Sequence, residues 1–207
     1  SYSVQMRDVR TGTKTWASVK TRAGLRVEVH CLAFSRDGRT LAKGGGAAIV
    51  LKDTRTGKFK SQLGRHWTQV FEVNEDQEII GLKGPLTGHF GHILSIAFSP
   101  DGKSLASAST DQAVRLWNLR TGTSRLFDLG PKTSADSVAF SPDGKILASA
   151  SFIDYTIRFW KVPSGKLIRE LPCGEGGHAP RMVFSPDGRL FAVPFSETRP
   201  KKRRGPG

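Results

Sequence analysis

Residues 88–118 read GHFGHILSIAFSPDGKSLASASTDQAVRLWN, and this stretch decides the fold class. Side chains over 93–98 can alternate between the two sides of an extended chain, as in a strand with two different faces. The Ser-Pro-Asp-Gly run at 99–102 then reverses the chain, because proline presets φ, aspartate bonds its own backbone and glycine accepts a positive φ. Small and apolar runs follow at 105–109 and 113–118. The stretch therefore predicts three successive antiparallel strands joined by turns.

The same phrase recurs along the chain. Its copies are CLAFSRDG (31–38), IAFSPDG (96–102), VAFSPDG (138–144) and MVFSPDG (182–188). Their final glycines lie 64, 42 and 44 residues apart. A period of about 40–45 residues indicates propeller blades of four strands each. The fourth strands, such as 124–128 and 166–171, are more polar, which suits the outer edge of a blade.

On these residues, the stretch 88–118 closely resembles a WD40 repeat, and poorer copies of the repeat continue to about residue 195. In that family a histidine, a serine or threonine, an aspartate and a tryptophan form a hydrogen-bonded tetrad that ties the loops of a blade together. The resemblance implies a structural tetrad of His89, Ser109, Asp111 and Trp117, with Ser107 as the other candidate for the serine. A structural role is expected because a buried aspartate and a buried indole N–H both need partners.

The other repeats depart from this pattern. The repeat at 129–160 keeps Asp154 and Trp160 but has Pro131 where the histidine would align, so the resemblance implies only a partial tetrad there. The repeat at 25–53 lacks the histidine, the aspartate and the tryptophan, and its aligned residues are Leu25, Gly46 and Lys52. That blade is expected to be held by packing alone.

The predicted fold is an all-β propeller of four-stranded antiparallel blades, about four full and one truncated, over residues 1–195. Its parts are residues 1–20, third and fourth strands that complete the last blade; 21–63, a blade; 64–86, a truncated blade; 87–128 and 129–171, two blades; and 172–195, the first strands of the last blade. A long insertion between blades is the alternative for 64–86. With so few blades, the chain is expected to be a fragment or a degenerate relative of a larger propeller, and a closed five-bladed ring is the alternative.

Charge is the unusual feature of the composition. The chain has 32 lysines and arginines against 18 aspartates and glutamates, a net charge of +14. Residues 196–207 are predicted to form a disordered basic tail, whose cations are Arg199, Lys201, Lys202, Arg203 and Arg204. The rest of the chain remains basic without them, which favours acidic surfaces, nucleic acid or anionic lipid as partners.

The sequence carries no motif of an enzyme. The glycine-rich runs at 43–46 and 174–177 lack the Gly-Lys-Ser/Thr ending of a phosphate-binding loop. There is no GxSxG elbow, and no pair of carboxylates stands out as an acid/base couple. The two cysteines are far apart in the sequence and match no zinc-binding spacing, so they are expected to be free thiols. We therefore expect no catalytic residues, no cofactor and no metal.

The resemblance implies a non-catalytic scaffold for protein or peptide partners, and the charge favours acidic ones. Direct binding of nucleic acid through the basic surface and tail is the second hypothesis, and a regulatory segment of a larger signalling enzyme is the third. Self-association is expected if the ring is incomplete. No stretch approaches the ~18 apolar residues of a membrane span, and no targeting signal is readable. The compartment is therefore unassigned, with the cytoplasm favoured.

Overall fold

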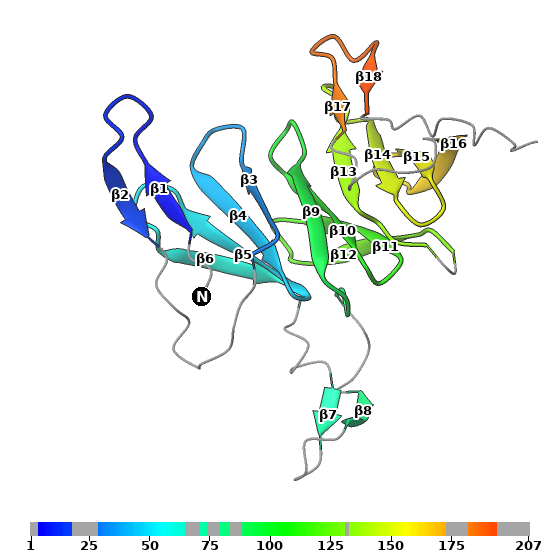
Figure 1. Ribbon diagram of the computed structural model, residues 1–207, viewed down its shortest axis with the longest axis horizontal. Coiled ribbons are helices and arrows are strands. Elements are labelled where there is room, and N and C mark those ends of the chain that lie inside the picture. The colour runs from blue at the N-terminus through cyan, green and yellow to red at the C-terminus, as the bar shows by residue number, and fades with distance from the viewer. Residues whose placement is uncertain are drawn as a thin grey trace, which may run out of the picture.

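The computed structural model describes residues 4–17, 29–64, 71–73, 79–82, 88–130, 133–172 and 182–193. Every regular element in these ranges is a β-strand, and the strands form three four-stranded and three two-stranded antiparallel sheets. Within the same ranges no helix is long and apolar enough to cross a membrane. Figure 1 shows the four-stranded sheets side by side in a curved row, as blades. The predicted all-β class and the four-stranded blades are confirmed.

Each blade follows the order of the chain, so neighbouring strands are joined by short connections. The first blade consists of β3 (Cys31–Phe34), β4 (Thr40–Gly45), β5 (Ala48–Asp53) and β6 (Phe59–Leu63). The second consists of β9 (Ile93–Phe98), β10 (Ser104–Ser109), β11 (Ala113–Asn118) and β12 (Ser124–Asp128). The third consists of β13 (Ser137–Phe140), β14 (Ile146–Ser151), β15 (Thr156–Lys161) and β16 (Lys166–Pro172).

The turn after each first strand forms for local reasons. In the second blade the carboxylate of Asp101 accepts hydrogen bonds from the Ser99 hydroxyl at 2.6 Å and from the Lys103 amide at 3.0 Å. Gly102 adopts a φ of 68°, which glycine reaches without steric penalty. The copies at 35–39, 141–145 and 185–189 repeat these bonds, so the repeated phrase produces the same turn in every blade.

The first and second blades pack directly against each other. Their shared core includes Ile49 and Leu63 from the first blade and Ile93 and Trp117 from the second, all nearly inaccessible to solvent. The Ile93 amide also donates to the carbonyl of Gly46 at 2.9 Å. Fully burying an isoleucine or leucine contributes about 1.5–3 kcal/mol, so this contact is a substantial part of the core.

This contact bears on segment 64–86, for which a truncated blade was predicted and an inter-blade insertion was the alternative. The only described strands of that segment are β7 (Phe71–Val73) and β8 (Ile79–Leu82), which pair with each other. In Figure 1 this hairpin lies outside the row of blades. Because the apolar faces of the first two blades already cover each other, we propose that residues 64–86 form an insertion between blades.

The second and third blades share another core. It includes Phe127 and Trp160, whose ring centroids are 5.6 Å apart, together with Val114 and Leu147. Small residues alternate in β10 and β14, and nearly all of them are buried, which lets the sheets approach closely.

The predicted closure of the ring is not seen. Strands β1 (Gln5–Arg7) and β2 (Lys14–Ala17) pair only with each other, as do β17 (Val183–Phe184) and β18 (Phe191–Ala192). These two pairs lie at opposite ends of the row (Figure 1). Trp16 fixes the first pair against the first blade, because its indole N–H donates to the carbonyl of Thr54 and its ring covers Gly57. The described strands of residues 1–20, β1 and β2, therefore do not pair with the last blade.

Candidate interaction surfaces

A buried chain of hydrogen bonds crosses the second blade. The indole N–H of Trp117 donates to the Ser107 hydroxyl at 2.7 Å, and this hydroxyl lies 2.7 Å from Nε2 of His89. Nδ1 of His89 is 2.8 Å from the Asp111 carboxylate, which also accepts from the Phe90 amide at 3.1 Å. His89 comes from the segment before β9 and Asp111 from the β10–β11 loop, so the chain ties two connections to the sheet.

The donors and acceptors of this chain agree with a neutral histidine. Burial lowers the pKa of His89 below its usual value, and the nearby Asp111 carboxylate offsets only part of this effect. With one proton on the ring, Nδ1–H donates to Asp111 and Nε2 accepts from Ser107, which leaves Ser107 free to accept from Trp117. Burial alone would raise the pKa of Asp111, but the hydrogen bonds that it accepts outweigh burial and lower it.

The serine of the tetrad corrects the sequence prediction. Ser109 was the expected member, yet its hydroxyl accepts a hydrogen bond from the Asp111 amide at 3.2 Å. The bridging residue is Ser107, the other candidate. Residues 105 and 107 face the same side of β10, and Leu105 pairs with Trp117 across the sheet, so the indole reaches Ser107 diagonally. The third blade repeats this geometry, because the Trp160 indole donates to Ser149 at 2.8 Å.

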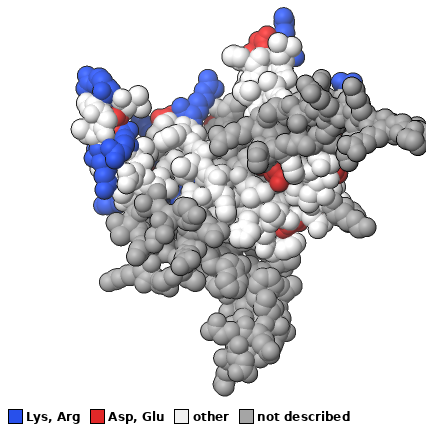
Figure 2. Space-filling view, viewed as in Figure 1, with Lys and Arg blue, Asp and Glu red and all other residues white. Residues whose placement is uncertain are grey.

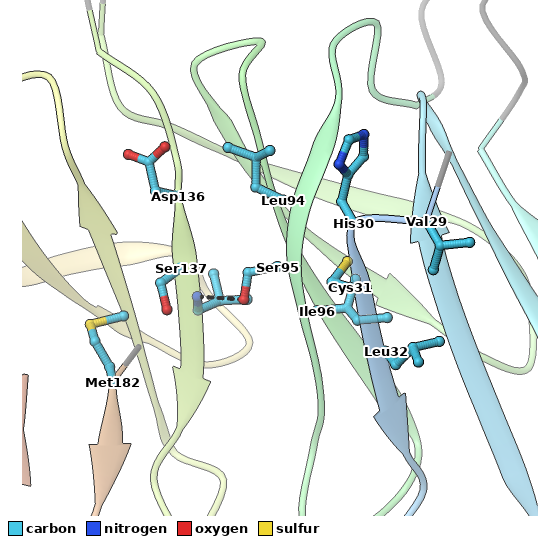
Figure 3. A pocket seen from close by; sticks show the side chains of 11 residues that line it. Val29, His30, Cys31, Leu32, Leu94, Ser95, Ile96, Asp136, Ser137 and Met182 are labelled. Atoms are coloured by element: carbon cyan, nitrogen blue, oxygen red, sulfur yellow. Dashed lines mark hydrogen bonds between the residues drawn. The ribbon is translucent and has the colours of Figure 1, made fainter. Parts of the chain in front are cut away.

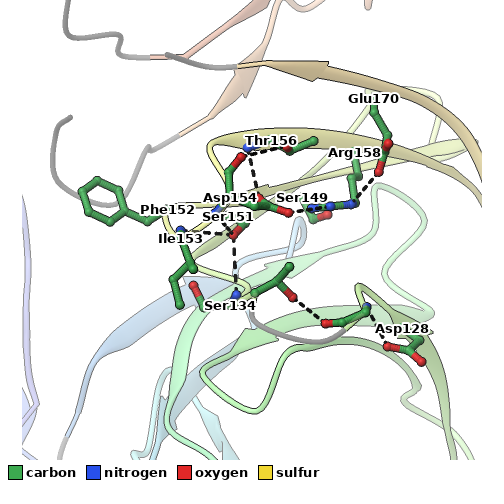
Figure 4. Close-up of polar contacts among 12 residues, drawn as sticks. Asp128, Ser134, Ser149, Ser151, Phe152, Ile153, Asp154, Thr156, Arg158 and Glu170 are labelled. Atoms are coloured by element: carbon green, nitrogen blue, oxygen red, sulfur yellow. Dashed lines mark hydrogen bonds and ion pairs between the residues drawn. The ribbon is translucent and has the colours of Figure 1, made fainter. Parts of the chain in front are cut away.

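The partial tetrad of the third blade brings Asp154 and Trp160 into different networks. Asp154 has no histidine partner among the described residues; its carboxylate accepts from the Arg158 guanidinium at 2.6 Å. Arg158 also donates to Glu170 at 2.8 Å, as Figure 4 shows. Sequence analysis did not single out Arg158. The sequence does contain a sign of this role. The repeat lacks the histidine that would pair with the aspartate, and an arginine follows the aspartate four positions later.

Positive charge collects at one end of the blades. The turns at this end, which we call the turn face, are residues 8–14, 35–40, 53–58, 99–104, 118–123, 141–146, 161–166 and 185–190. Turns of adjacent blades meet here: Arg36 donates to the carbonyl of Pro100 at 3.3 Å, and Arg125 to that of Ser164 at 3.4 Å. In Figure 2 blue side chains stand out over the tips of the β1–β2 and β3–β4 hairpins.

The cations of the turn face are exposed. They are Arg10, Lys14, Arg36, Arg39, Arg55, Lys58, Lys103, Arg120, Lys145, Lys161, Lys166 and Arg189. The carboxylates of this face are fewer, and each accepts hydrogen bonds inside its own turn: Asp8, Asp37, Asp53, Asp101, Asp143 and Asp187. The bond from the Ser35 hydroxyl, for example, lowers the pKa of Asp37. The turn face thus presents more positive than negative charge, on turns that are already ordered.

The opposite end of the blades has the other character. Among the described residues, this loop face comprises 45–48, 109–113, 128–130, 133–137 and 151–156. Its described residues include no lysine or arginine, but they include four aspartates: Asp111, Asp128, Asp136 and Asp154. The two ends of the described blades therefore differ in charge: cations predominate on the turn face, and aspartates are the charged residues of the loop face.

A cavity of about 650 Å³ lies along the first strands of the blades. Figure 3 shows its walls, with Cys31 from β3, Ile96 from β9, Ser137 from β13 and Met182 just before β17. Burial raises the pKa of Cys31 to about 12, so this thiol stays protonated and is a poor nucleophile. Within the described ranges no three His, Cys, Asp or Glu side chains are grouped so that they could hold a metal ion.

Several predicted features lie outside the described residues, including Leu25, Pro131 and the glycine-rich run at 174–177, and two more bear on reactivity and charge. They are Cys173 and the basic tail with Arg199, Lys201, Lys202, Arg203 and Arg204.

Comparison with known proteins identifies the repeats. The family model described as "WD domain, G-beta repeat" matches residues 82–118 and 125–161, which include all of the second blade's tetrad and most of the third blade. These two segments are WD40 repeats. The matched repeats are the two blades whose tryptophan donates to a strand serine.

Proteins with similar WD40 sequences are diverse. Protein tipD of Dictyostelium discoideum is 32% identical over 106 residues, 51% of this chain and 14% of the relative. THO complex subunit 3 of Arabidopsis thaliana is 32% identical over 110 residues, 51% of this chain and 34% of the relative. Apoptotic protease-activating factor 1 of Danio rerio is 33% identical over 179 residues, 86% of this chain and 12% of the relative. The chain thus matches only about a third or less of the length of these relatives.

Proposed function

We propose that this chain is a non-catalytic protein-interaction scaffold whose turn face binds acidic segments of a partner protein. WD40-repeat proteins generally act as protein-interaction scaffolds. The observation that carries the finer proposal is that exposed lysines and arginines on the turns of adjacent blades outnumber the carboxylates there. A surface of one predominant sign attracts partners of the other sign and raises their rate of association.

The turns that carry these cations have a fixed backbone conformation, which supports this role. Arg10, Arg55 and Arg120 occupy the same position of three equivalent turns, and their backbone amides donate to Asp8, Asp53 and Asn118 respectively. A partner that meets these cations does not have to order the backbone that carries them. Such preorganisation lowers the entropic cost of binding.

The burial of the tetrad supports a non-catalytic role. Asp111, His89 and Ser107 form the same sequence of contacts as an acid, a base and a nucleophile. His89 and Ser107 are, however, completely inaccessible to solvent, and the Ser107 hydroxyl already accepts from Trp117. A nucleophile must reach its substrate. We therefore assign this chain of contacts to blade stability.

Charge reversal at the three equivalent arginines tests the proposal. The probe is a short fluorescent glutamate-rich peptide, and its counterpart has glutamines in place of the glutamates. We expect the combined variant Arg10→Glu, Arg55→Glu and Arg120→Glu to bind the acidic peptide at least tenfold more weakly than the unchanged chain. The matched control is Arg169→Glu, an exposed arginine on the outer strand β16 and not on the turn face, which should change the affinity less than twofold.

A duplex oligonucleotide of random sequence separates the protein hypothesis from nucleic-acid binding. If the oligonucleotide binds much more tightly than the acidic peptide, and its affinity falls steeply and linearly with the logarithm of salt concentration, the turn face is a phosphate-binding surface instead. Equal binding of the glutamate and glutamine peptides would also contradict the proposal.

A further inference from the structure

The β14–β15 loop of the third blade exposes apolar side chains on the loop face. Ile153 is 58% exposed and Phe152 is 36% exposed, and the Phe152 ring lies 5.9 Å from the ring of Tyr155. The equivalent loop of the second blade has Thr110 at its start and Gln112 near its end, and it is one residue shorter. An exposed apolar side chain on its own is ordinary, but two adjacent ones beside an aromatic ring form a small contact surface.

Side chains hold the backbone of this loop in place. The amide of Phe152 donates to the Asp136 carboxylate at 2.6 Å, and the amide of Ile153 donates to the Ser151 hydroxyl at 3.3 Å. Figure 4 shows that Asp154 fixes the far side of the loop, where it accepts from the Thr156 amide at 3.2 Å and pairs with Arg158. The exposed side chains therefore stand on an ordered backbone.

Tyr155 has a φ of 51°, a left-handed conformation that is uncommon for an aromatic residue. This conformation costs about 1–2 kcal/mol relative to the right-handed region. Gln112 has a similar φ of 68° at the equivalent position of the second blade, so this conformation belongs to the geometry of the loop in the repeat. Here the strained residue holds its ring against Phe152, at the tip of the loop.

The surroundings of the loop carry negative charge. Asp128 and Asp136 belong to the same face, and Glu170 lies near the end of β16 that approaches the loop. Arg158 is 11% exposed and already bonded to Asp154 and Glu170, and the exposed Arg169 precedes Glu170 on β16. An apolar group placed on the loop would thus have carboxylates beside it and no exposed cation among the described residues of this face.

We propose that the β14–β15 loop, residues 151–156, docks a partner segment in which apolar side chains are flanked by lysine or arginine. The apolar side chains cover Ile153 and Phe152, and the cations face the carboxylates of the loop face. This site is separate from the turn face, and it takes a partner of opposite charge. With both sites, the chain would join an acidic segment bound at the turn face to a basic segment bound at the loop face.

The test uses the full chain and short fluorescent peptides, with binding followed by anisotropy. The probe peptide has leucines between lysines. One counterpart has serines in place of the leucines, and another has glutamates in place of the lysines. We expect the leucine–lysine peptide to bind at least tenfold more tightly than either counterpart, because only it satisfies both the apolar surface and the charge.

Two matched variants locate the site. Ile153→Ser should weaken binding of the leucine–lysine peptide at least tenfold. Leu190→Ser removes a similarly exposed side chain, 72% accessible, from the turn face and should change the affinity less than twofold. Asp128→Asn removes one charge while its side-chain oxygen can still accept from the Gly130 amide, and it should weaken binding about twofold to threefold. Thermal melts of all variants establish that each is folded.

Several results would overturn the proposal. They are no binding of the leucine–lysine peptide, equal binding of the serine–lysine peptide, an Ile153→Ser variant that binds like the unchanged chain, and equal losses for Ile153→Ser and Leu190→Ser. An unchanged affinity in Asp128→Asn would remove the electrostatic part of the proposal. The three arginine reversals on the turn face should leave this peptide's binding intact, so failure here is distinguishable from failure of the proposed function.

Discussion

Arg158 donates to Asp154 across 2.6 Å in the blade where a proline, Pro131, occupies the aligned position of the tetrad histidine. In the second blade the corresponding Asp111 is paired with His89 instead. In both blades the loop aspartate therefore has a hydrogen-bonding partner. The partner precedes the first strand in the second blade and lies in the third strand, β15, in the third blade. A degenerate repeat can keep its fold in this way, because a partly buried carboxylate is most destabilising when it lacks a partner.

Replacing Arg158 with methionine tests this substitution of partners. The pair is partly exposed, since the side chains of Arg158 and Asp154 are 11% and 25% accessible, so we expect a loss of about 2 kcal/mol in the free energy of unfolding. Arg158→Lys should lose about 1 kcal/mol, because lysine keeps the charge but not the two-armed geometry. Urea unfolding measures both, with Arg169→Met as an exposed control expected to lie within about 0.5 kcal/mol of the unchanged chain. If Arg158→Met is as stable as the control, the pair does not substitute for the tetrad.

Two neighbouring serines of β10 should respond differently to alanine. Ser107→Ala leaves the Trp117 indole N–H and His89 Nε2 buried without their hydroxyl partner, which should cost about 2–3 kcal/mol. Ser109→Ala removes one longer bond to the Asp111 amide and should cost about 1 kcal/mol or less. Both serines are fully buried, so the pair is closely matched. Equal losses in chemical denaturation would contradict the assignment of Ser107 to the tetrad.

The buried histidine predicts a pH dependence of stability. Because the pKa of His89 is lowered in the folded state from 6.5, the unfolded chain binds its proton first as the pH falls. The contribution is fully present above pH 6.5 and is lost below it, by at most about 1.4 kcal/mol for each pH unit. Urea unfolding between pH 7.5 and 5.5 should show this decline in the unchanged chain. His89→Asn should be less stable throughout, with a flatter profile; a decline of the same slope in that variant would exclude His89 as its source.

The parts of the fold that could be predicted from the sequence are those set by short-range chemistry. The Ser-x-Asp-Gly phrase contains every group that closes its own turn, so the copies at 35–38 and 185–188 form it even where the rest of the repeat is poor. The burial of Trp117 and Trp160 could be predicted from the WD40 resemblance, because the tetrad tryptophan is buried and its indole N–H needs a partner.

The parts that could not be predicted depend on contacts between distant segments. Two serines of β10 face the same side, and only the cross-strand pairing of Leu105 with Trp117 distinguishes Ser107 from Ser109. The place of Trp16 against Thr54 likewise depends on tertiary packing, since its strand pattern suits either end of the row. Charge was predictable in sign, but its concentration on the turn face became visible only when the turns were placed at one end.

The direct contact between the first two blades leads to a prediction about the insertion. Replacing residues 70–84, which include β7 and β8, with a Gly-Ser linker of equal length should leave a single cooperative melt and change the free energy of unfolding by less than about 1 kcal/mol. The physical reason is that the core of Ile49, Leu63 and Ile93 is already closed without the hairpin. Leu63→Ala in that core should instead cost about 2–5 kcal/mol. If the linker variant loses its cooperative transition while Leu63→Ala keeps it, the hairpin contributes to the row of blades as a structural unit, and the insertion is the wrong description.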